Sequence, residues 1–243
     1  FTLAADAKAD SQLYPEKDVI EPPYKHVLDK LYERQNVLGS VLLEVFGEML
    51  GLQPTIFKKM FEQEGGDFGT IRLLRYPGGE LSEEEAEKAN VGISAHTDFE
   101  AFTLMHQDAP GLQFMPANGD GWVDAPVRPK EFVVIVGDVL ERFTNGMLKA
   151  TPHRVALTPH ARCSIIRFNG VAPDTVIAPL PQFINEHQPP AYVEMSVALV
   201  LSLSRSFGLP LALALSLVLS LSLSSSLSLS LTHIHTHTLS LFL

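Results

Sequence analysis

The sequence predicts a mainly β fold, a sandwich or jelly roll, with helices placed before it. After residue 66 the chain consists of short apolar or alternating runs, which is the pattern of β-strands. Turn signals separate these runs, as at Pro77-Gly78-Gly79 and Asn145-Gly146. Many short strands with frequent turns favour a jelly roll over a parallel sheet, whose strands need long crossover connections.

The region before residue 66 has a different pattern. Residues 1–21 are mixed and polar, and we expect a loop there. Residues 24–50 carry apolar side chains at helical spacing, so we expect an amphipathic helix that ends at Gly51. A second, shorter helix is expected from Pro54 to Gly65-Gly66. The apolar face of the first helix is predicted to comprise Val27, Leu28, Leu31, Val37, Leu38, Val41, Leu42, Val45, Phe46 and Met49.

The strands are expected in runs that are apolar or alternate with period two. Between these runs, the acidic stretch 82–88 is predicted to be a solvated helix turn or loop, and we assign it no role. The four clearest runs are residues 69–76, 91–95, 101–105 and 132–136.

The end of the chain is a low-complexity tail. From residue 197 onward Leu and Ser alternate, and the tail finishes with a His-Thr repeat. A CT repeat translates as Leu-Ser and a CA repeat as His-Thr, so we hypothesise a translated microsatellite or intron. Residues 207–223 could alternatively be a marginal membrane anchor, and genuine strands are a third reading. We therefore predict a truncated helical region over 1–66, a jelly-roll domain over 67–190 and a tail over 191–243 outside the fold.

The bulk composition narrows the class of partner. The net charge is -10 and the sequence pI is near 5.3, which argues against a nucleic-acid surface and favours a small-molecule substrate. Cys163 is the single cysteine, so no internal disulfide can form and a reducing compartment, the cytoplasm, is expected. The chain starts at Phe1 rather than Met, so we expect a fragment or a processed chain, and a removed targeting peptide is compatible with it. We expect a monomer that is not bound to a membrane.

Histidines and carboxylates at strand ends are the candidate metal ligands. His96-Thr97-Asp98 follows an apolar run, and alternate residues of a strand share one face. His106-Gln107-Asp108 has the same pattern, and spacing alone leaves the two open. His153 lies between two apolar strands, while its competitor His160 lies in a turn. Two imidazoles and one carboxylate suit non-haem Fe(II), although they also build catalytic zinc sites.

Arg162 and Ser164 are the candidate anion ligands. They start an apolar run and share one face of the strand expected there. A guanidinium that faces inward is costly unless an anion meets it. A planar cationic fork with a hydroxyl beside it can hold a carboxylate.

These pieces, taken in order, resemble the 2-oxoglutarate and Fe(II)-dependent dioxygenases of the isopenicillin N synthase-like branch. The similarity covers about 100 residues strongly. It is carried by Arg72-Leu73-Leu74-Arg75-Tyr76-Pro77, His96-Thr97-Asp98, Pro110-Gly111-Leu112-Gln113, Gly121-Trp122, Gly137-Asp138, Leu140-Glu141, Thr144-Asn145-Gly146, Lys149-Ala150-Thr151, His153-Arg154-Val155 and Arg162-Cys163-Ser164.

The resemblance implies roles for these residues. It implies that His96, Asp98 and His153 bind Fe(II), which favours the first of the two H-x-D motifs. It implies further that Arg162 and Ser164 hold the distal carboxylate of 2-oxoglutarate. Tyr76 matches a tyrosine that hydrogen-bonds this co-substrate, and Phe168 matches a position that lines the substrate pocket.

The resemblance also implies the fold and the activity. The fold is a double-stranded β-helix, a jelly roll with flanking N-terminal helices. The activity is oxidation of a small organic molecule with O2, by hydroxylation or desaturation, with release of succinate and CO2. Phe102 and Phe114 are further candidates for the pocket. The alternatives are a zinc-dependent hydrolase or isomerase, and a truncated dioxygenase homologue without activity.

Overall fold

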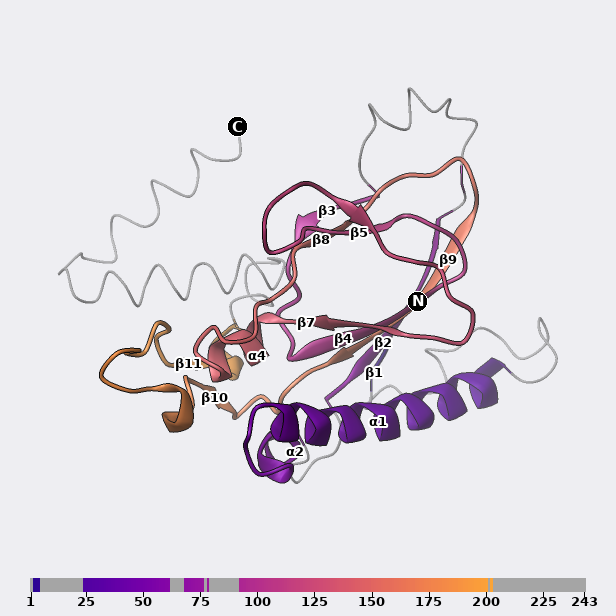
Figure 1. The fold of residues 1–243 in the computed structure, drawn as a ribbon. Coiled ribbons are helices and arrows are strands. Elements are labelled where there is room, and N and C mark those ends of the chain that lie inside the picture. The colour runs from indigo at the N-terminus through magenta and orange to yellow at the C-terminus, as the bar shows by residue number, and fades with distance from the viewer. Residues whose placement is uncertain are drawn as a thin grey trace, which may run out of the picture.

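The fold is a pair of antiparallel sheets with helices packed on one side. In the computed structural model, residues 2–4, 24–61, 68–76, 78, 92–200 and 202 are described. Figure 1 shows α1 (Tyr24–Met49) running along one side of the larger sheet, with the smaller sheet on the other side. The short helix α2 (Thr55–Phe61) follows α1 on that same side. The predicted jelly roll preceded by helices is confirmed.

The larger sheet, here the major sheet, has the strand order β1-β2-β9-β4-β7. The smaller sheet, here the minor sheet, has the order β3-β8-β5-β6. The major-sheet strands are β1 (Thr2–Ala4), β2 (Thr70–Tyr76), β9 (Arg162–Asn169), β4 (Phe102–Gln107) and β7 (Val133–Val136). The minor-sheet strands are β3 (Ile93–His96), β8 (His153–Val155), β5 (Leu112–Phe114) and β6 (Val123–Asp124). The remaining elements are α4 (Asp138–Phe143), β10 (Val176–Ile177), η3 (Pro181–Phe183) and β11 (Met195–Ser196).

Alternation along the major sheet separates two apolar layers. Met105 of β4 and Ile166 of β9 face the minor sheet, where Leu112 of β5 packs against them. The intervening residues face the helices, as in the contact of Phe102 with Phe46 of α1, whose ring centroids are 5.4 Å apart. The interior between the sheets is therefore a space distinct from the core under the helices.

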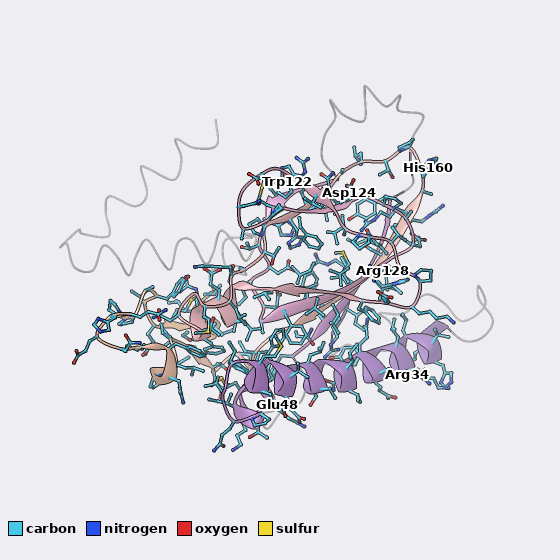
Figure 2. The ribbon with its side chains drawn as sticks, in the orientation of Figure 1. Arg34, Glu48, Trp122, Asp124, Arg128 and His160 are labelled. Carbon is cyan, nitrogen blue, oxygen red and sulfur yellow. The ribbon has the colours of Figure 1, made fainter. Side chains whose placement is uncertain are left out.

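The buried face of α1 is narrower than the sequence predicts. Leu28, Tyr32 and Leu43 are buried against the sheet, but Val37 and Met49 are 67% and 74% exposed. Figure 2 shows Arg34 and Glu48 pointing away from the sheet. The apolar residues of α1 cover more of its circumference than one sheet face can bury, so the prediction that all of them form the core face was wrong.

Both ends of the described chain pack further than expected. Thr2–Ala4 pairs with β2 as an edge strand, so the loop predicted over 1–21 was wrong for these three residues. Met195, Val197 and Val200 are 3%, 2% and 0% exposed within the core under the helices, so the fold continues past the limit expected at residue 190.

Several expectations fall outside the described residues. They are the helix end at Gly65-Gly66, the acidic stretch 82–88, the span candidate 207–223 and the His-Thr repeat. Within the described part of the chain, no helix is long and apolar enough to cross a membrane.

Packing of the C-terminal residues is testable with one substitution at two positions. Val197→Ala should lower the free energy of unfolding by about 1–3 kcal/mol, because it removes methyl groups from a filled core. Val193→Ala is the matched control, since Val193 is 38% exposed and should change stability by less than about 0.5 kcal/mol. Urea denaturation of both variants measures the difference, and equal midpoints would contradict the packing.

Candidate metal centre and co-substrate site

Three predicted ligands converge at the junction of β3 and β8. His96 ends β3 and His153 begins β8, and the two residues are direct partners across the antiparallel pair. Asp98 follows β3, and its Oδ1 lies 3.6 Å from His96 Nε2 and 3.7 Å from His153 Nε2. One ligand atom from each of the three residues lies within 4.8 Å of the others.

Neighbouring groups fix the orientation of each ligand. His96 Nδ1 is 2.8 Å from the carbonyl of Ser94, and His153 Nδ1 is 3.0 Å from the carbonyl of Thr151. A proton donated from Nδ1 leaves Nε2 as the free lone pair, and both Nε2 atoms lie beside Asp98. The hydroxyl of Thr103 donates to Asp98 Oδ2 at 2.5 Å, so Oδ1 is the oxygen left for a metal.

The chemistry of this donor set fits a divalent ion. Two metal bonds of about 2.1 Å can span up to about 4.2 Å, so both nitrogen-to-Oδ1 pairs can share one ion. Burial lowers the pKa of His153, which favours the neutral imidazole that binds metals. The side chains of Asp98 and His153 are 5% and 3% exposed, whereas that of His96 is 34% exposed. Three ligands on one side leave the opposite positions open, as in non-haem iron oxygenases.

Two further carboxyl groups lie near the three ligands His96, Asp98 and His153, here called the triad, and both favour a cation there. Burial raises the pKa of Glu100 to about 7, and the Asp98 carboxylate raises it as well. Burial likewise raises the pKa of Asp138 to about 6, although a hydrogen bond from Thr97 opposes the shift. A divalent cation beside these groups would offset their mutual repulsion.

The rival motif has other partners. His106 Nδ1 lies 2.9 Å from the carbonyl of Glu131, and its ring packs against Phe132. Asp108 accepts a hydrogen bond from the Cys163 amide at 2.7 Å. Among the described residues, only the triad gathers into a group that could hold a metal, and the exposed His160 lies at the outer edge of the minor-sheet side (Figure 2).

Arg162, Ser164 and Tyr76 form a polar cradle on the inner face of the major sheet. Tyr76 of β2 pairs directly with Arg162 of β9, and Ser164 is the next inward residue of β9. Arg162 is 1% exposed and its Cζ lies 4.9 Å from the centre of the Tyr76 ring. Arg162 Nη1, Ser164 Oγ and Tyr76 Oη are all buried, and none has a hydrogen-bond partner in the described structure.

These three unpaired atoms fit the carboxylate of a bound co-substrate. Burial lowers the pKa of the Arg162 guanidinium, because an interior charge is costly, and the neighbouring Tyr76 side chain opposes the shift. Unsatisfied buried polar groups cost about 1–3 kcal/mol each, so their clustering at one place points to a ligand. A carboxylate would accept hydrogen bonds from all three.

Gln107, the residue that orients the Arg162 guanidinium within this cradle, was not identified from the sequence. Gln107 Oε1 accepts from Arg162 Nε at 3.3 Å and from Nη2 at 3.0 Å, which leaves Nη1 for a ligand. Gln107 Nε2 donates to the carbonyl of Ala125 at 3.2 Å, and this bond fixes the amide. The alternation of Thr103, Met105 and Gln107 along β4 was the available signal for an inward Gln107.

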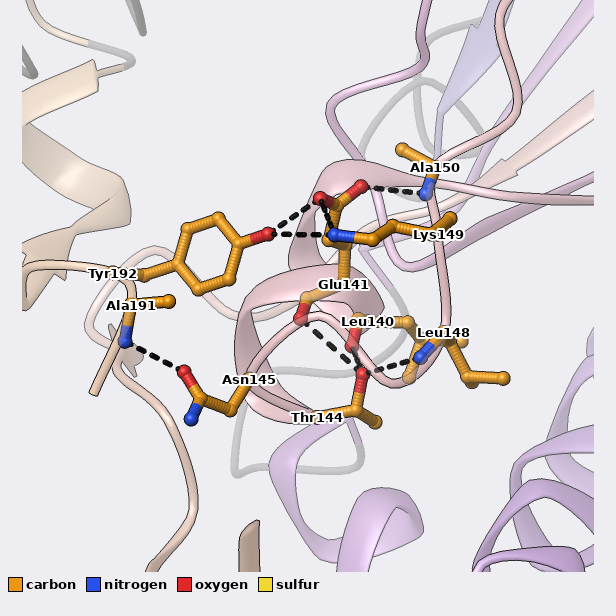
Figure 3. Close-up of polar contacts among 9 residues, drawn as sticks. All are labelled: Leu140, Glu141, Thr144, Asn145, Leu148, Lys149, Ala150, Ala191 and Tyr192. Atoms are coloured by element: carbon orange, nitrogen blue, oxygen red, sulfur yellow. Dashed lines mark hydrogen bonds and ion pairs between the residues drawn. The ribbon is translucent and has the colours of Figure 1, made fainter. Parts of the chain in front are cut away.

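Glu141 of α4 holds the segment that leads into His153 (Figure 3). Its Oε2 accepts from the Ala150 amide at 2.6 Å, and its Oε1 accepts from the Tyr192 hydroxyl at 2.5 Å and from Lys149 Nζ at 3.3 Å. Burial alone would raise the pKa of Glu141, but the hydrogen bonds from Tyr192 and Ala150 lower it below its usual value. No sequence pattern available beforehand assigned this role to Glu141.

The substrate-pocket candidates divide between the two sides of the major sheet. Phe168 and Phe114 pack with the apolar residues between the sheets, and the Phe114 ring centroid lies 6.3 Å from that of His153. Phe102 is 0% exposed and packs with the helices, so its assignment to the pocket was wrong. The alternation of β4 places Phe102 and Thr103 on opposite faces.

The comparisons with known proteins agree on the family. Residues 69–170 match the family model of the 2OG-Fe(II) oxygenase superfamily. The chain is 30% identical to 2-oxoglutarate-dependent dioxygenase 21, chloroplastic, of Oryza sativa subsp. japonica over 70% of this chain and 50% of that protein. It is 34% identical to 1-aminocyclopropane-1-carboxylate oxidase of Diospyros kaki, over 71% of this chain and 54% of that protein. Residues 69–170 therefore place this part of the chain in the 2OG-Fe(II) oxygenase superfamily.

Solved structures show the same fold. The crystal structure of JOX2 in complex with 2OG, Fe and JA matches with a TM-score of 0.71 and 24% identity, covering 83% of this chain and 58% of that one. The dioxygenase for auxin oxidation in rice matches with a TM-score of 0.65 and 24% identity, covering 86% of this chain and 68% of that one. The chain spans about half the length of the curated relatives it matches. The prediction of Fe(II) and 2-oxoglutarate as cofactors is confirmed at the level of the family.

Removing one triad ligand should show which of the two H-x-D motifs binds Fe(II). His96→Ala should weaken anaerobic Fe(II) binding by at least about 100-fold, more than the loss of an outer partner of a metal ligand costs. His106→Ala is the matched control and should bind Fe(II) like the parent protein. Isothermal titration under anaerobic conditions measures both affinities, and an effect confined to His106→Ala would contradict the assignment.

The Glu141 contacts should contribute stability that depends on pH. Because the fold lowers the pKa of Glu141, its carboxylate stabilises the fold above the unfolded pKa of about 4.3. That contribution is lost as the pH falls through the lower folded pKa. Glu141→Gln should therefore cost about 1–2 kcal/mol at pH 7 and progressively less below about pH 4.

The control for this prediction is Glu131→Gln, since the Glu131 side chain is 60% exposed. It should leave the free energy of unfolding nearly unchanged across the same pH range. A cost for Glu141→Gln that grows on acidification would contradict the role assigned to its carboxylate.

Proposed function

We propose that the chain is an Fe(II)- and 2-oxoglutarate-dependent dioxygenase that hydroxylates or desaturates a small organic molecule and releases succinate and CO2. One observation carries the proposal. The buried atoms Arg162 Nη1, Ser164 Oγ and Tyr76 Oη lack partners in the described structure, and they face the same interior as the triad. A dicarboxylate with one end at the cradle and the other at the metal would satisfy both.

Each residue has a defined task in this proposal. His96, Asp98 and His153 would hold Fe(II), which when bound supplies the oxygen-activating redox chemistry that side chains cannot provide. Arg162 would receive the distal carboxylate of 2-oxoglutarate on its free Nη1, with Ser164 donating a second hydrogen bond. Tyr76 closes the cradle from β2. Thr103 keeps Asp98 Oδ2 occupied, so that Oδ1 stays with the metal.

Placement between the two sheets is itself part of the proposal. Arg162, Ser164 and His153 are 1%, 2% and 3% exposed, so bulk water has little access to the cradle. A charge-assisted hydrogen bond is stronger where water does not compete. The buried guanidinium would thus select an anionic co-substrate and fix its direction toward the triad.

The zinc-dependent hydrolase or isomerase is the less favoured alternative. The triad alone would suit zinc equally well. A zinc hydrolase, however, has no need for the inward Arg162 or for the Gln107 amide that fixes it. A homologue without activity is the other alternative, and succinate formation by this chain would exclude it.

The described site residues all come from a single chain. The two sheets supply the triad and the cradle without a second copy. We therefore propose that the protein acts as a monomer.

Arg162 provides the sharpest test of the function. With anaerobic Fe(II), addition of 2-oxoglutarate to the parent protein should produce a weak visible charge-transfer band. Arg162→Gln should abolish this band at matched concentrations while Fe(II) binding persists, because the loss of a buried charged hydrogen bond costs about 2–3 kcal/mol or more.

Arg128→Gln is the control for this experiment, since the Arg128 side chain is 64% exposed. It should behave like the parent protein. Folded, Fe(II)-loaded parent protein that gives no band with 2-oxoglutarate would refute the proposed co-substrate.

A further inference from the structure

A second arginine faces the interior of the jelly roll, and the proposed co-substrate does not use it. Ile71 and Leu73 of β2 pack toward the helix side, with Leu28 and Tyr32 of α1. Because successive residues of a strand point to opposite faces, Arg72 points toward the space between the sheets. The contact of Arg72 with Phe168, itself packed between the sheets, agrees with this direction.

The Arg72 guanidinium is held by an aromatic face and keeps its donors free. Its Cζ lies 5.2 Å from the centre of the Phe168 ring. Arg72 is exposed, and no described residue forms a hydrogen bond or ion pair with it, although the Glu100 carboxyl lies in its electrostatic range. A guanidinium that stacks on a ring still presents its N–H groups at its edges. Phe168 therefore orients the Arg72 guanidinium, and its N–H groups can donate hydrogen bonds to a ligand.

Arg72 is separate from the co-substrate cradle along the sheet. Arg72 pairs with Ile166 of β9, whereas Tyr76 pairs with Arg162. Tyr76 lies four positions beyond Arg72 along β2, which corresponds to about 13 Å. A carboxylate held at Arg162 is thus too far along the sheet to be the natural partner of Arg72.

Arg72 lies instead toward the metal end of the interior. Phe168, which contacts Arg72, pairs across the sheet with Thr103, and the Thr103 hydroxyl binds Asp98. The Glu100 carboxyl is in electrostatic range of both Asp98 and Arg72. An anion at Arg72 would therefore sit beside the open positions of the triad, where the oxidised substrate must lie.

We propose that Arg72 binds a carboxylate of the oxidised substrate, which is an organic acid whose apolar body packs between the sheets against Phe168. The proposal rests on the proposed function, since it concerns the same active site. A carboxylate matches the planar fork of a guanidinium. The neighbouring carboxyl groups of Asp98 and Glu100 oppose a more highly charged group, so a carboxylate fits better than a phosphate.

The test compares carboxylic acids with their primary amides. Hexanoate, phenylacetate and cinnamate are each paired with hexanamide, phenylacetamide and cinnamamide. Perturbation of the charge-transfer band of the anaerobic Fe(II) and 2-oxoglutarate complex gives the affinity, and succinate formation in air gives the coupled turnover. At least one acid should bind about tenfold or more tightly than its amide, as one charged hydrogen-bonded contact allows.

Arg72→Gln should reduce the acid-to-amide ratio to near one, and Arg72→Lys should restore part of it by returning the charge. The ratio is insensitive to a general loss of activity. Arg75→Gln is the matched control, because Arg75 lies on the same strand but on the opposite face, and it should keep the ratio of the parent protein.

The outcomes separate this proposal from the proposed function. A parent protein that shows the band but binds no acid better than its amide overturns the proposal and leaves the proposed function standing. The same holds if Arg72→Gln keeps the full preference for acids, or if added 2-oxoglutarate at high concentration abolishes that preference by occupying Arg72 itself. A parent protein with Fe(II) bound but no band overturns both.

Discussion

The register of β9 decides which charged side chains face the interior of the jelly roll. β9 lies between β2 and β4, and its ladders to both strands put Arg162, Ser164 and Phe168 on the inner face. A slip of one residue would exchange these for Cys163 and Arg167. The two buried arginines of β9 have different surroundings. Arg167 bonds Asn169 and Asn36 and stacks on the Tyr32 ring under α1. Arg162 bonds Gln107 and stacks on the Tyr76 ring on the inner face of the sheet.

The minor sheet adds the metal ligands to this inner face. β3 and β8 bring His96 and His153 together, and Thr103 of the major sheet ties Asp98 to the opposite wall. Glu141 then holds the segment before β8 through the Ala150 amide. The site therefore depends on both sheets, and the helices contribute by covering the outer face so that the interior stays between the sheets. The same arrangement buries the Asp98 carboxylate and the Arg162 guanidinium, and a cation and a dicarboxylate would offset the cost of these two buried charges.

Local sequence patterns predicted the secondary structure and the face of a strand on which a side chain lies. They failed for features that depend on packing between distant parts of the chain. Strands β2, β4 and β7, the helix α1 and the shared face of Arg162 and Ser164 followed from period and turn signals. Phe102 was misplaced because an apolar strand buried on both faces does not reveal which face is the pocket. The edge pairing of Thr2–Ala4 and the packing of Val197 depend on distant partners that no local pattern encodes. Gln107 and Glu141 act through other residues, so their residue types did not reveal their roles, although alternation along β4 placed Gln107 on the inner face.

The central claim is that an iron ion at the triad and a dicarboxylate at the cradle complete one site. A crystal structure of the protein grown anaerobically with Fe(II) and 2-oxoglutarate tests it most directly. The expected result is iron bound by His96, Asp98 and His153, with the distal carboxylate of 2-oxoglutarate within hydrogen-bonding distance of Arg162 Nη1 and Ser164 Oγ. Iron at another place, or 2-oxoglutarate bound without contact to Arg162, would contradict the claim.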